Sequence, residues 1–460
     1  MRLFGSSHGM MRNDALRVFR VLRGHPLLAA AALLSIPAMA QAQDTTRVPA
    51  GVELVGRYNV SKRPLVAVRP VAAAAENSAL ASTITDILRR DLDYSDRFEM
   101  GEVPGSLASG NIDYKQWNSL NVWYLVAAAV STTSGGYSLK LDLHDVVYGN
   151  VKSSNTYALP PANAPNFRMA VHRASDDIVR SITNQPGSAA TRIAFIRRAG
   201  SGYELVAVDY DGQNAQRIVS SPTMIYSPAW SPNGQKIAYG IRSTSTARVE
   251  LHERDLANGR TRVISARPEL SYTPAYSPDG KRLSFAISVG GETTEINDYD
   301  LEQGCCLRRL TRGRWYDLNP TYSGDGQRIA FLSDRLGSPH VFVMSAQGGE
   351  PTMLTPYNTE RVKFTAPSWS PTSTEVAFSG QSRGGFQIMI ADARRPGVAK
   401  QVTSSGDNED PSWAPDGRHI VFSSTGREGS GLYVIDTVTG RRRQVIAGSR
   451  LRTPEWSHRF

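Results

Sequence analysis

The stretch PAYSPDG (residues 274–280) decides the fold, because versions of it recur along the last three fifths of the chain. These near-copies follow the pattern Pro-x-Trp/Tyr-Ser-Pro-Asp-Gly and are spaced 43 to 47 residues apart. They begin at Pro228, Pro274, Pro320, Pro367, Pro411 and Pro454. That period is typical of a four-stranded propeller blade. The sequence therefore predicts an all-β, six-bladed β-propeller.

A single repeat accounts for four strands. The phrase at 274–280 is a short strand followed by the turn Ser-Pro-Asp-Gly, and residues 282–286 then alternate apolar and polar side chains. Proline presets φ at the second turn position, and glycine accepts the positive φ at the exit of the hairpin. A second pair of strands is predicted in each repeat, for example within 340–355 of the repeat that begins at Pro320, where Gly348 and Gly349 supply the turn. In the repeat that begins at Pro367, Thr372 and Ser373 replace Asp-Gly, so we expect a different turn there.

The aromatic residue at the third position of the phrase is predicted to pack between neighbouring blades. Four of the seven tryptophans of the chain occupy this position. The six residues are Trp230, Tyr276, Tyr322, Trp369, Trp413 and Trp456. We expect them in the core.

The two ends of the array complement each other. Residues 192–196 resemble the second strand of every repeat, whereas the sixth phrase, PEWS (454–457), has no such strand after it. Pairing of the first strand with the last would close the ring and remove the free sheet edges that promote aggregation.

The start of the chain has the pattern of a secretory signal peptide, assigned to residues 1–42. Arg12, Arg17, Arg20 and Arg23 precede an apolar run at 27–36, and small residues suited to cleavage follow at 38–42. The run is shorter than the roughly 20 residues that span a bilayer. Cysteine occurs only at 305 and 306, so no thiol near the cleavage site would accept a lipid anchor. Met10 and Met11 are alternative start residues.

Residues 43–188 are predicted to form a small α/β domain, joined by a linker at 186–190 to a propeller over residues 189–460. Strands are expected at 65–70, 122–130 and 139–143, and amphipathic helices at 79–93 and 167–182. The polar helix faces are interpreted as solvated surface; they carry Asp86, Arg89, Arg90, Asp176, Asp177 and Arg180. The formal charge of +10 is scattered without a run of five or six like charges, which argues against nucleic-acid binding.

Catalysis is not expected. A propeller-linked peptidase needs a hydrolase domain with a Gly-x-Ser-x-Gly elbow, and we expect no such elbow in this chain. Outside the array and the signal peptide, only about 150 residues remain, too few for that domain. The histidines do not pair at the spacing of a zinc site; those considered are His144, His172, His252, His340 and His419. No cofactor is predicted, and the sequence leaves open whether carboxylates in the channel hold calcium.

The signal peptide, the short α/β domain and the sixfold array ending in PEWS together resemble the TolB family, periplasmic components of the Tol-Pal system of Gram-negative bacteria. The resemblance implies a monomeric adaptor in the periplasm. Such proteins bind the peptidoglycan-associated lipoprotein Pal through one mouth of the propeller and TolA through the mature N-terminus. They support outer-membrane integrity and cell division.

The predicted Pal-binding residues, here named the mouth residues, precede the repeat prolines, because the loops that enter the innermost strands emerge at one mouth. Aromatic anchors beside charges suit a protein interface. The set comprises Tyr226, Leu270, Tyr272, Thr273, Asp317, Leu318, Asn319, Lys363, Phe364, Asn408, Glu409, Asp410 and Arg452. The alternative is that these are polar loops with a few buried caps.

The segment VELVGRY (52–58) has strand-like alternation and follows Pro-Ala-Gly, so it can add to a partner as an edge strand. The residues of this chain that are predicted to bind TolA are Val52, Glu53, Leu54, Val55 and Arg57. The alternative is that the segment pairs within the α/β domain.

Two short motifs and one further function complete the predictions. The stretch DYDG (209–212) alternates oxygen ligands but lacks the glutamate that closes a calcium loop, so a tight turn is expected. Cys305 and Cys306 form either a vicinal disulfide or, as we expect, two thiols on opposite faces of a strand. The alternative function is an exported propeller that binds a sugar or peptide in its channel.

Overall fold

The computed structural model describes residues 63–460, apart from 247, 266–270, 291–292, 357–361 and 383–384. Residues Val60–Phe460 form one compact unit. The predicted signal peptide, the segment at 52–58 and Leu270 lie outside the described residues.

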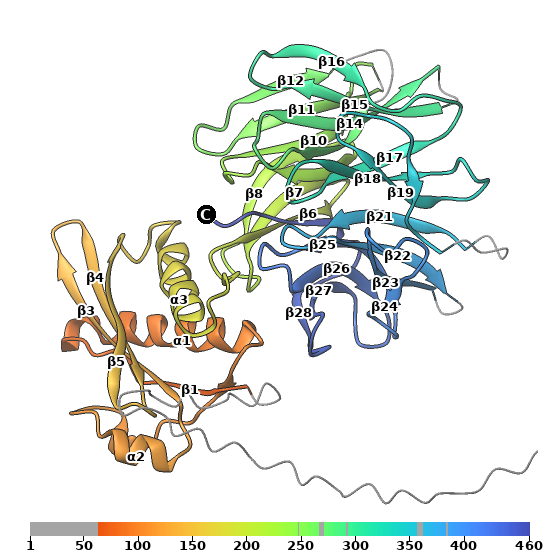
Figure 1. The fold of residues 1–460 in the computed structure, drawn as a ribbon. Coiled ribbons are helices and arrows are strands. Elements are labelled where there is room, and N and C mark those ends of the chain that lie inside the picture. The colour runs from red at the N-terminus through yellow and green to blue at the C-terminus, as the bar shows by residue number, and fades with distance from the viewer. Residues whose placement is uncertain (1–62, 247, 266–270, 291–292, 357–361, 383–384) are drawn as a thin grey trace, which may run out of the picture. The chain divides into compact units, whose positions relative to one another are not determined.

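The α/β domain is built on a five-stranded sheet of order β2-β1-β3-β4-β5, in which β1 runs parallel to β2 and β3 (Figure 1). Its strands are β1 (Leu65–Val68), β2 (Glu99–Met100), β3 (Tyr124–Thr133), β4 (Gly136–Asp145) and β5 (Asn150–Leu159). Its helices are η1 (Ala75–Asn77), α1 (Ser78–Tyr94), η2 (Gly105–Leu107), α2 (Tyr114–Ser119) and α3 (Phe167–Thr183). The two long helices expected from the apolar spacing are confirmed.

Alternation along the strands divides the core of this domain into two faces. Val66 and Val68 pack with the apolar stripes of α1 and α3, whereas Ala67 between them packs with Trp117 of α2. Successive side chains of a strand point to opposite faces, so one strand serves both clusters.

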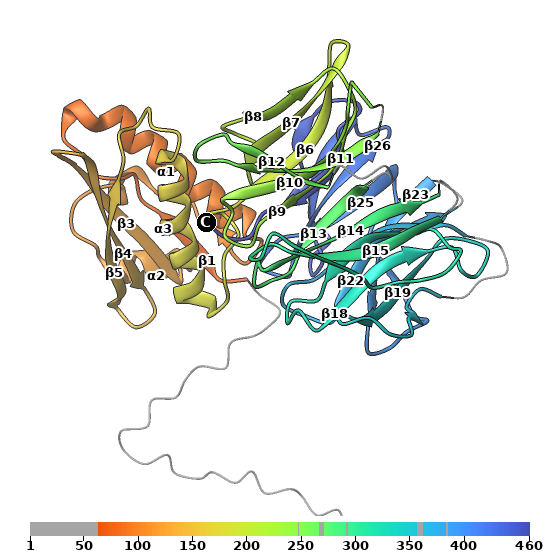
Figure 2. The ribbon, with the colours of Figure 1, turned by 90° about the horizontal axis from the view of Figure 1, so that it is seen from above.

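Six four-stranded sheets form the propeller, in chain order from green to blue in Figure 1 and seen from above in Figure 2. Blade 1 contains β29 (Arg452–Trp456), β6 (Arg192–Ala199), β7 (Gly202–Asp209) and β8 (Gln216–Ser221). Blade 2 contains β9 (Ile225–Trp230), β10 (Lys236–Arg242), β11 (Val249–Asp255) and β12 (Thr261–Ser265). Blade 3 contains β13 (Ser271–Tyr276), β14 (Arg282–Val289), β15 (Thr293–Asp300) and β16 (Cys305–Arg309).

The other three blades follow the same antiparallel order. Blade 4 contains β17 (Asp317–Tyr322), β18 (Arg328–Ser333), β19 (His340–Ser345) and β20 (Thr352–Met353). Blade 5 contains β21 (Phe364–Trp369), β22 (Glu375–Ser382), β23 (Gly385–Asp392) and β24 (Lys400–Gln401). Blade 6 contains β25 (Asp407–Trp413), β26 (His419–Thr425), β27 (Gly431–Asp436) and β28 (Arg442–Ala447).

The turn chemistry of the phrase is visible in blade 3. The hydroxyl of Ser277 donates to Asp279 (2.6 Å) and accepts the N–H of Arg282 (2.9 Å), and Gly280 has φ +72°. In blade 5, the segment with Thr372 forms bends in place of this turn, as expected from the missing Asp-Gly.

Ring closure is confirmed. β29 pairs antiparallel with β6, with Trp456 opposite Ile193. The Trp456 side chain is 4% exposed and packs with residues of blades 1 and 6. Its Nε1–H donates to Thr191 Oγ1 at 2.7 Å. Trp230, Trp369 and Trp413 are likewise buried in clusters shared by neighbouring blades.

The expectation that the polar helix faces are solvated is wrong for Asp176. This side chain is 1% exposed and accepts the N–H groups of Ala189 (2.8 Å) and Ala190 (3.0 Å), so it anchors the residues before β6. Burial raises its pKa to about 6, although Arg459 and these hydrogen bonds oppose the shift. Amphipathic periodicity identifies the apolar stripe of a helix but not which polar residues meet another segment.

Candidate partner-binding mouth and channel

The repeat proline shapes every inner strand. Proline has no N–H to donate, so within sheets it is confined to edges and bulges. In β13, Tyr272 pairs with Ala286 and Ala275 with Ser284, which leaves Thr273 and Pro274 opposite a single residue. The inner strands β9, β17, β21, β25 and β29 show the same register shift. Each inner strand therefore contains a β-bulge at its proline.

The residue before each proline has positive φ, between 35° and 55°. The six residues are Ser227, Thr273, Asn319, Ala366, Asp410 and Thr453. This backbone region is uncommon for residues other than glycine and is kept only where the surroundings impose it. Because the bulge interrupts the alternation, two successive side chains before each proline are half-buried or exposed, while the third residue before it is buried in five of the six blades.

Hydrogen bonds between blades hold this ring of bulges in place. The N–H of Thr453 donates to the Asp410 carboxylate (3.0 Å), and the N–H of Asn319 donates to Thr273 Oγ1 (3.2 Å). One residue after the proline, Ser412 accepts the N–H of Trp456 (3.0 Å). Thr321 and Ser368 do the same for Trp369 and Trp413. The backbone at the mouth is thus set before any partner arrives.

The inner strands enclose a cavity of about 370 Å³ lined by residues of all six repeat phrases. The carboxyl groups among its described lining residues are those of Asp410 and Glu455. Burial raises the pKa of Glu455 to about 7, partly offset by a hydrogen bond from Ser412. Burial also raises the pKa of Asp410.

The structure sorts the predicted mouth residues by exposure. Lys363 and Arg452 are exposed, and Leu270 lies outside the described residues. The half-buried set comprises Tyr226, Tyr272, Thr273, Leu318, Asn319, Glu409 and Asp410. The remaining three, Asp317, Phe364 and Asn408, are buried.

These three side chains are buried within the blades rather than presented at the surface of the mouth. Phe364 is 3% exposed and packs against His340 and Phe378, so truncating it is expected to destabilise blade 5 rather than leave the fold intact. Asp317 accepts a hydrogen bond from Arg335 (3.2 Å) and Asn408 one from Ser424 (2.8 Å). These are the buried caps that the alternative interpretation anticipated.

Two buried polar clusters join the α/β domain to the propeller, and no sequence pattern pointed to either of them. In the first, Nδ1 of His172 lies 2.8 Å from an oxygen of Asp91, whose other oxygen accepts the hydroxyl of Tyr210 (2.8 Å). In the second, Asp96 lies 3.1 Å from His419 Nε2 and accepts from Arg441 (3.0 Å). Both clusters meet the propeller at the strand ends opposite the mouth residues.

The two histidines favour the charged form. Burial lowers the pKa of His419, but the Asp416 carboxylate and hydrogen bonds with Asp416 and Asp96 outweigh it, so the pKa is raised. The pKa of His172 is raised in the same way by Asp91 against the effect of burial.

Each cluster also contains a triad with metal-ligand atoms close together, His172/Asp209/Asp211 and Asp96/His419/Asp436. Arginines already pair with these carboxylates. Arg168 lies 2.5 Å from Asp211, and Arg418 lies 2.6 Å from Asp436. A cation would face these positive charges, so the triads do not fit a metal site.

Two further motifs are settled by their surroundings. The stretch at 209–212 is the expected tight turn, with the Gly212 N–H donating to Asp209 O (2.8 Å). The expectation that the chain has no Gly-x-Ser-x-Gly sequence is wrong, because one occurs at 380–384, inside the array. Its Ser382 is the last residue of β22, which is followed by β23, whereas a nucleophile elbow requires a helix after the strand.

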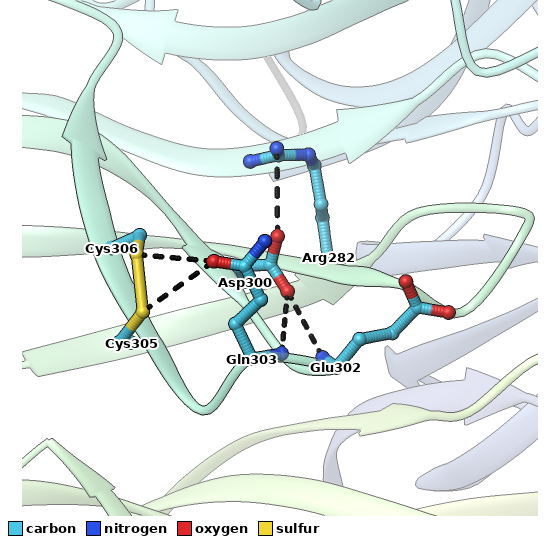
Figure 3. The surroundings of a disulfide bond; sticks show 6 residues. All are labelled: Arg282, Asp300, Glu302, Gln303, Cys305 and Cys306. Atoms are coloured by element: carbon cyan, nitrogen blue, oxygen red, sulfur yellow. Dashed lines mark hydrogen bonds and ion pairs between the residues drawn. A yellow bond between two sulfur atoms is a disulfide. The ribbon is translucent and has the colours of Figure 1, made fainter.

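The expectation of two free thiols is wrong: Cys305 and Cys306 form a disulfide (Figure 3). Among the described residues, no helix is both long and apolar enough to cross a membrane.

A family model described as the TolB beta propeller domain matches residues 179–460, and one described as the TolB amino-terminal domain matches residues 55–151. The Tol-Pal system protein TolB of Bordetella pertussis is 30% identical over 286 residues, covering 61% of this chain and 64% of that protein. The same protein of Albidiferax ferrireducens is 33% identical over 201 residues, 43% of this chain and 46% of the relative. The chain thus spans between about half and two thirds of the length of these relatives.

The crystal structure of TolB from Acinetobacter baumannii is similar to this structure with a TM-score of 0.75 and 26% identity, covering 86% of this chain and 97% of that one. Fold and site define a two-domain protein in which a small α/β domain precedes a closed six-bladed propeller whose inner strands enclose a cavity. The chain belongs to the TolB family.

Proposed function

We propose that the chain is a periplasmic adaptor of the Tol-Pal system. It binds Pal at the propeller mouth and TolA through residues 52–57, and it supports outer-membrane integrity and cell division. Family membership supports the system, and relatives carry the name of a system protein rather than of an enzyme. The observation that carries the proposal is the fixed ring of bulges, which presents partly exposed side chains around the channel from all six blades.

The chemistry of the mouth suits a protein partner. Two residues before the proline, blades 2 to 4 present Tyr226, Tyr272 and Leu318, whereas blades 6 and 1 present Glu409 and Arg452. One side of the mouth is therefore aromatic and apolar, and the other is charged. Aromatic side chains anchor protein interfaces, and charges at the rim set orientation. A preset backbone lowers the entropic cost of binding.

The proposal is tested by calorimetric titration of Tyr272→Ala with the periplasmic domain of Pal. Loss of an aromatic anchor is expected to weaken binding about 30-fold, which corresponds to about 2 kcal/mol. Tyr148→Ala is the matched control, because Tyr148 is 52% exposed in the α/β domain and should leave the affinity unchanged. Equal affinities for Pal of both variants and the unmodified chain would exclude the aromatic side of the mouth from the Pal interface.

The TolA contact is tested separately. Deleting residues 43–58 should abolish TolA binding and spare Pal binding, since the segment carries the proposed edge strand and none of the mouth residues. Retained TolA binding would refute this assignment.

A second candidate, a propeller that binds a small sugar or peptide, rests on the channel. Its volume of about 370 Å³ and its lining by tryptophans such as Trp413 and hydroxyls such as Ser412 suit a small polar ligand. A thermal-shift screen of such ligands tests this candidate; a ligand whose effect is lost on substituting channel residues would favour it over the adaptor.

A further inference from the structure

The disulfide Cys305–Cys306 lies at the start of β16, the outermost strand of blade 3 (Figure 3). Both cysteines are exposed. The channel is lined by β13, at the opposite edge of the same sheet. The bond is therefore open to solvent and separate from the mouth.

This bond contributes little to the stability of the fold. A disulfide stabilises mainly by restricting the unfolded chain, and the effect grows with the length of the loop that it closes. Neighbouring residues close the smallest loop that a chain allows, and this pair joins no two elements. Stabilisation of the fold therefore does not explain why the two cysteines are paired, and the remaining explanation is the reactivity of the disulfide itself.

The backbone at the pair is specialised. Asp298 pairs with Arg308 and Asp300 with Cys305, so Cys306 and the residue after it oppose a single residue of β15 in a β-bulge. Cys306 has φ +66°, and it is the one non-glycine residue with positive φ among the described residues of the outermost strands. Glycine usually occupies such a bulge position, because a side chain is disfavoured there. Bulges commonly redirect a side chain beside a functional site.

The neighbouring turn is suited to the reduced pair as well. The side-chain oxygen of Gln303 lies 3.4 Å from Cys306 Sγ and 3.7 Å from Cys305 Sγ (Figure 3). The carboxylate of Asp300 fixes this turn by accepting the N–H groups of Glu302 (3.0 Å) and Gln303 (2.9 Å). After reduction, the Gln303 oxygen can accept an S–H from either thiol, so the reduced form needs no rearrangement of the turn.

We propose that Cys305–Cys306 is a thiol–disulfide exchange site that accepts two electrons from a dithiol. A thiolate of the dithiol attacks one sulfur, the bond between the cysteines breaks, and the released cysteine thiolate takes a proton. The second thiol of the dithiol then attacks the mixed disulfide, closes its own disulfide and releases the second cysteine as a thiol. The protein pair is reduced and the dithiol is oxidised. A monothiol is a poorer reductant, because the freed neighbouring cysteine displaces it and restores the bond.

The test treats the folded full-length mature chain with dithiothreitol, then with iodoacetamide, and counts labelled cysteines by mass. We expect no labelling before reduction and two labelled cysteines after it, with an unchanged urea midpoint. When reduced glutathione at equal thiol concentration replaces dithiothreitol, iodoacetamide should label at most a tenth as many cysteines. A reduced Cys-x-x-Cys oxidoreductase forms a second arm: reduction by it identifies a protein dithiol as the source, and reduction by dithiothreitol alone identifies a small one.

Three results would overturn the proposal. These are two labelled thiols in the chain purified from an oxidising compartment, labelling only in denaturant, or a large fall in the urea midpoint on reduction. Cys306→Ser is the control variant, which should label once without reductant at Cys305.

Discussion

Replacing Trp456 by alanine tests ring closure, because this residue joins the first and last strands of the propeller. Its side chain is 4% exposed, packs with blades 1 and 6, and donates to Thr191. Truncating a buried tryptophan costs about 3–5 kcal/mol. Its backbone N–H bond to Ser412 survives the change, so the loss reports packing and the side-chain bond alone.

Trp456→Phe separates the two contributions. It keeps a ring in the cluster and removes the Nε1–H donor, so a loss of about 1–2 kcal/mol is expected. Urea unfolding followed by far-ultraviolet circular dichroism measures both variants, with any separate transition of the α/β domain fitted on its own. Trp315→Ala, in a loop between blades 3 and 4, is the control and should cost less. A loss below about 1 kcal/mol for Trp456→Ala would refute closure through this residue.

Two further substitutions test the half-buried carboxyl group of Glu455 and the buried carboxylate of Asp96. Burial raises the pKa of Glu455 to about 7, so the folded chain holds this proton more tightly than the unfolded chain does. The stabilising contribution of Glu455 is therefore complete below the ordinary pKa of a glutamate and is lost as pH rises through about 7. Glu455→Gln should therefore match the unmodified chain near pH 4 and exceed its unfolding free energy at pH 8, by up to about 3 kcal/mol; a pH-independent difference would contradict this. Asp96 has φ +56°, which asparagine tolerates, so Asp96→Asn isolates the charge that faces Arg441 and Arg443. It should cost about 3–5 kcal/mol in urea unfolding, and a loss under about 1 kcal/mol would show that the cluster holds nothing together.

The period of the repeat phrase predicts the blades because each phrase encodes its own strand, turn and strand. The turn-forming residues within each phrase were sufficient to predict its hairpin, as the hydrogen bond from Arg282 N–H to Ser277 shows. The ring closure also followed from sequence, since β6 and β29 each lacked a partner strand that the other supplies.

The site was predicted less well, because its geometry depends on the bulge at each proline. Period-two alternation alone cannot tell that Tyr272 and Thr273 are both partly exposed while Phe364 is buried. The repeated proline within a strand was the available indication, since proline favours bulges. Contacts such as that of Asp96 with His419, 323 residues apart, leave no pattern in a single sequence.

Calorimetric titration of the mature chain, from Gln43, with the periplasmic domain of Pal from the same organism tests the adaptor proposal most directly. The account predicts saturable binding with one Pal domain per chain, carried by the ring of bulges at the mouth. The absence of binding by a well-folded sample would contradict the proposal and favour the alternative of a propeller that binds a small ligand in its channel.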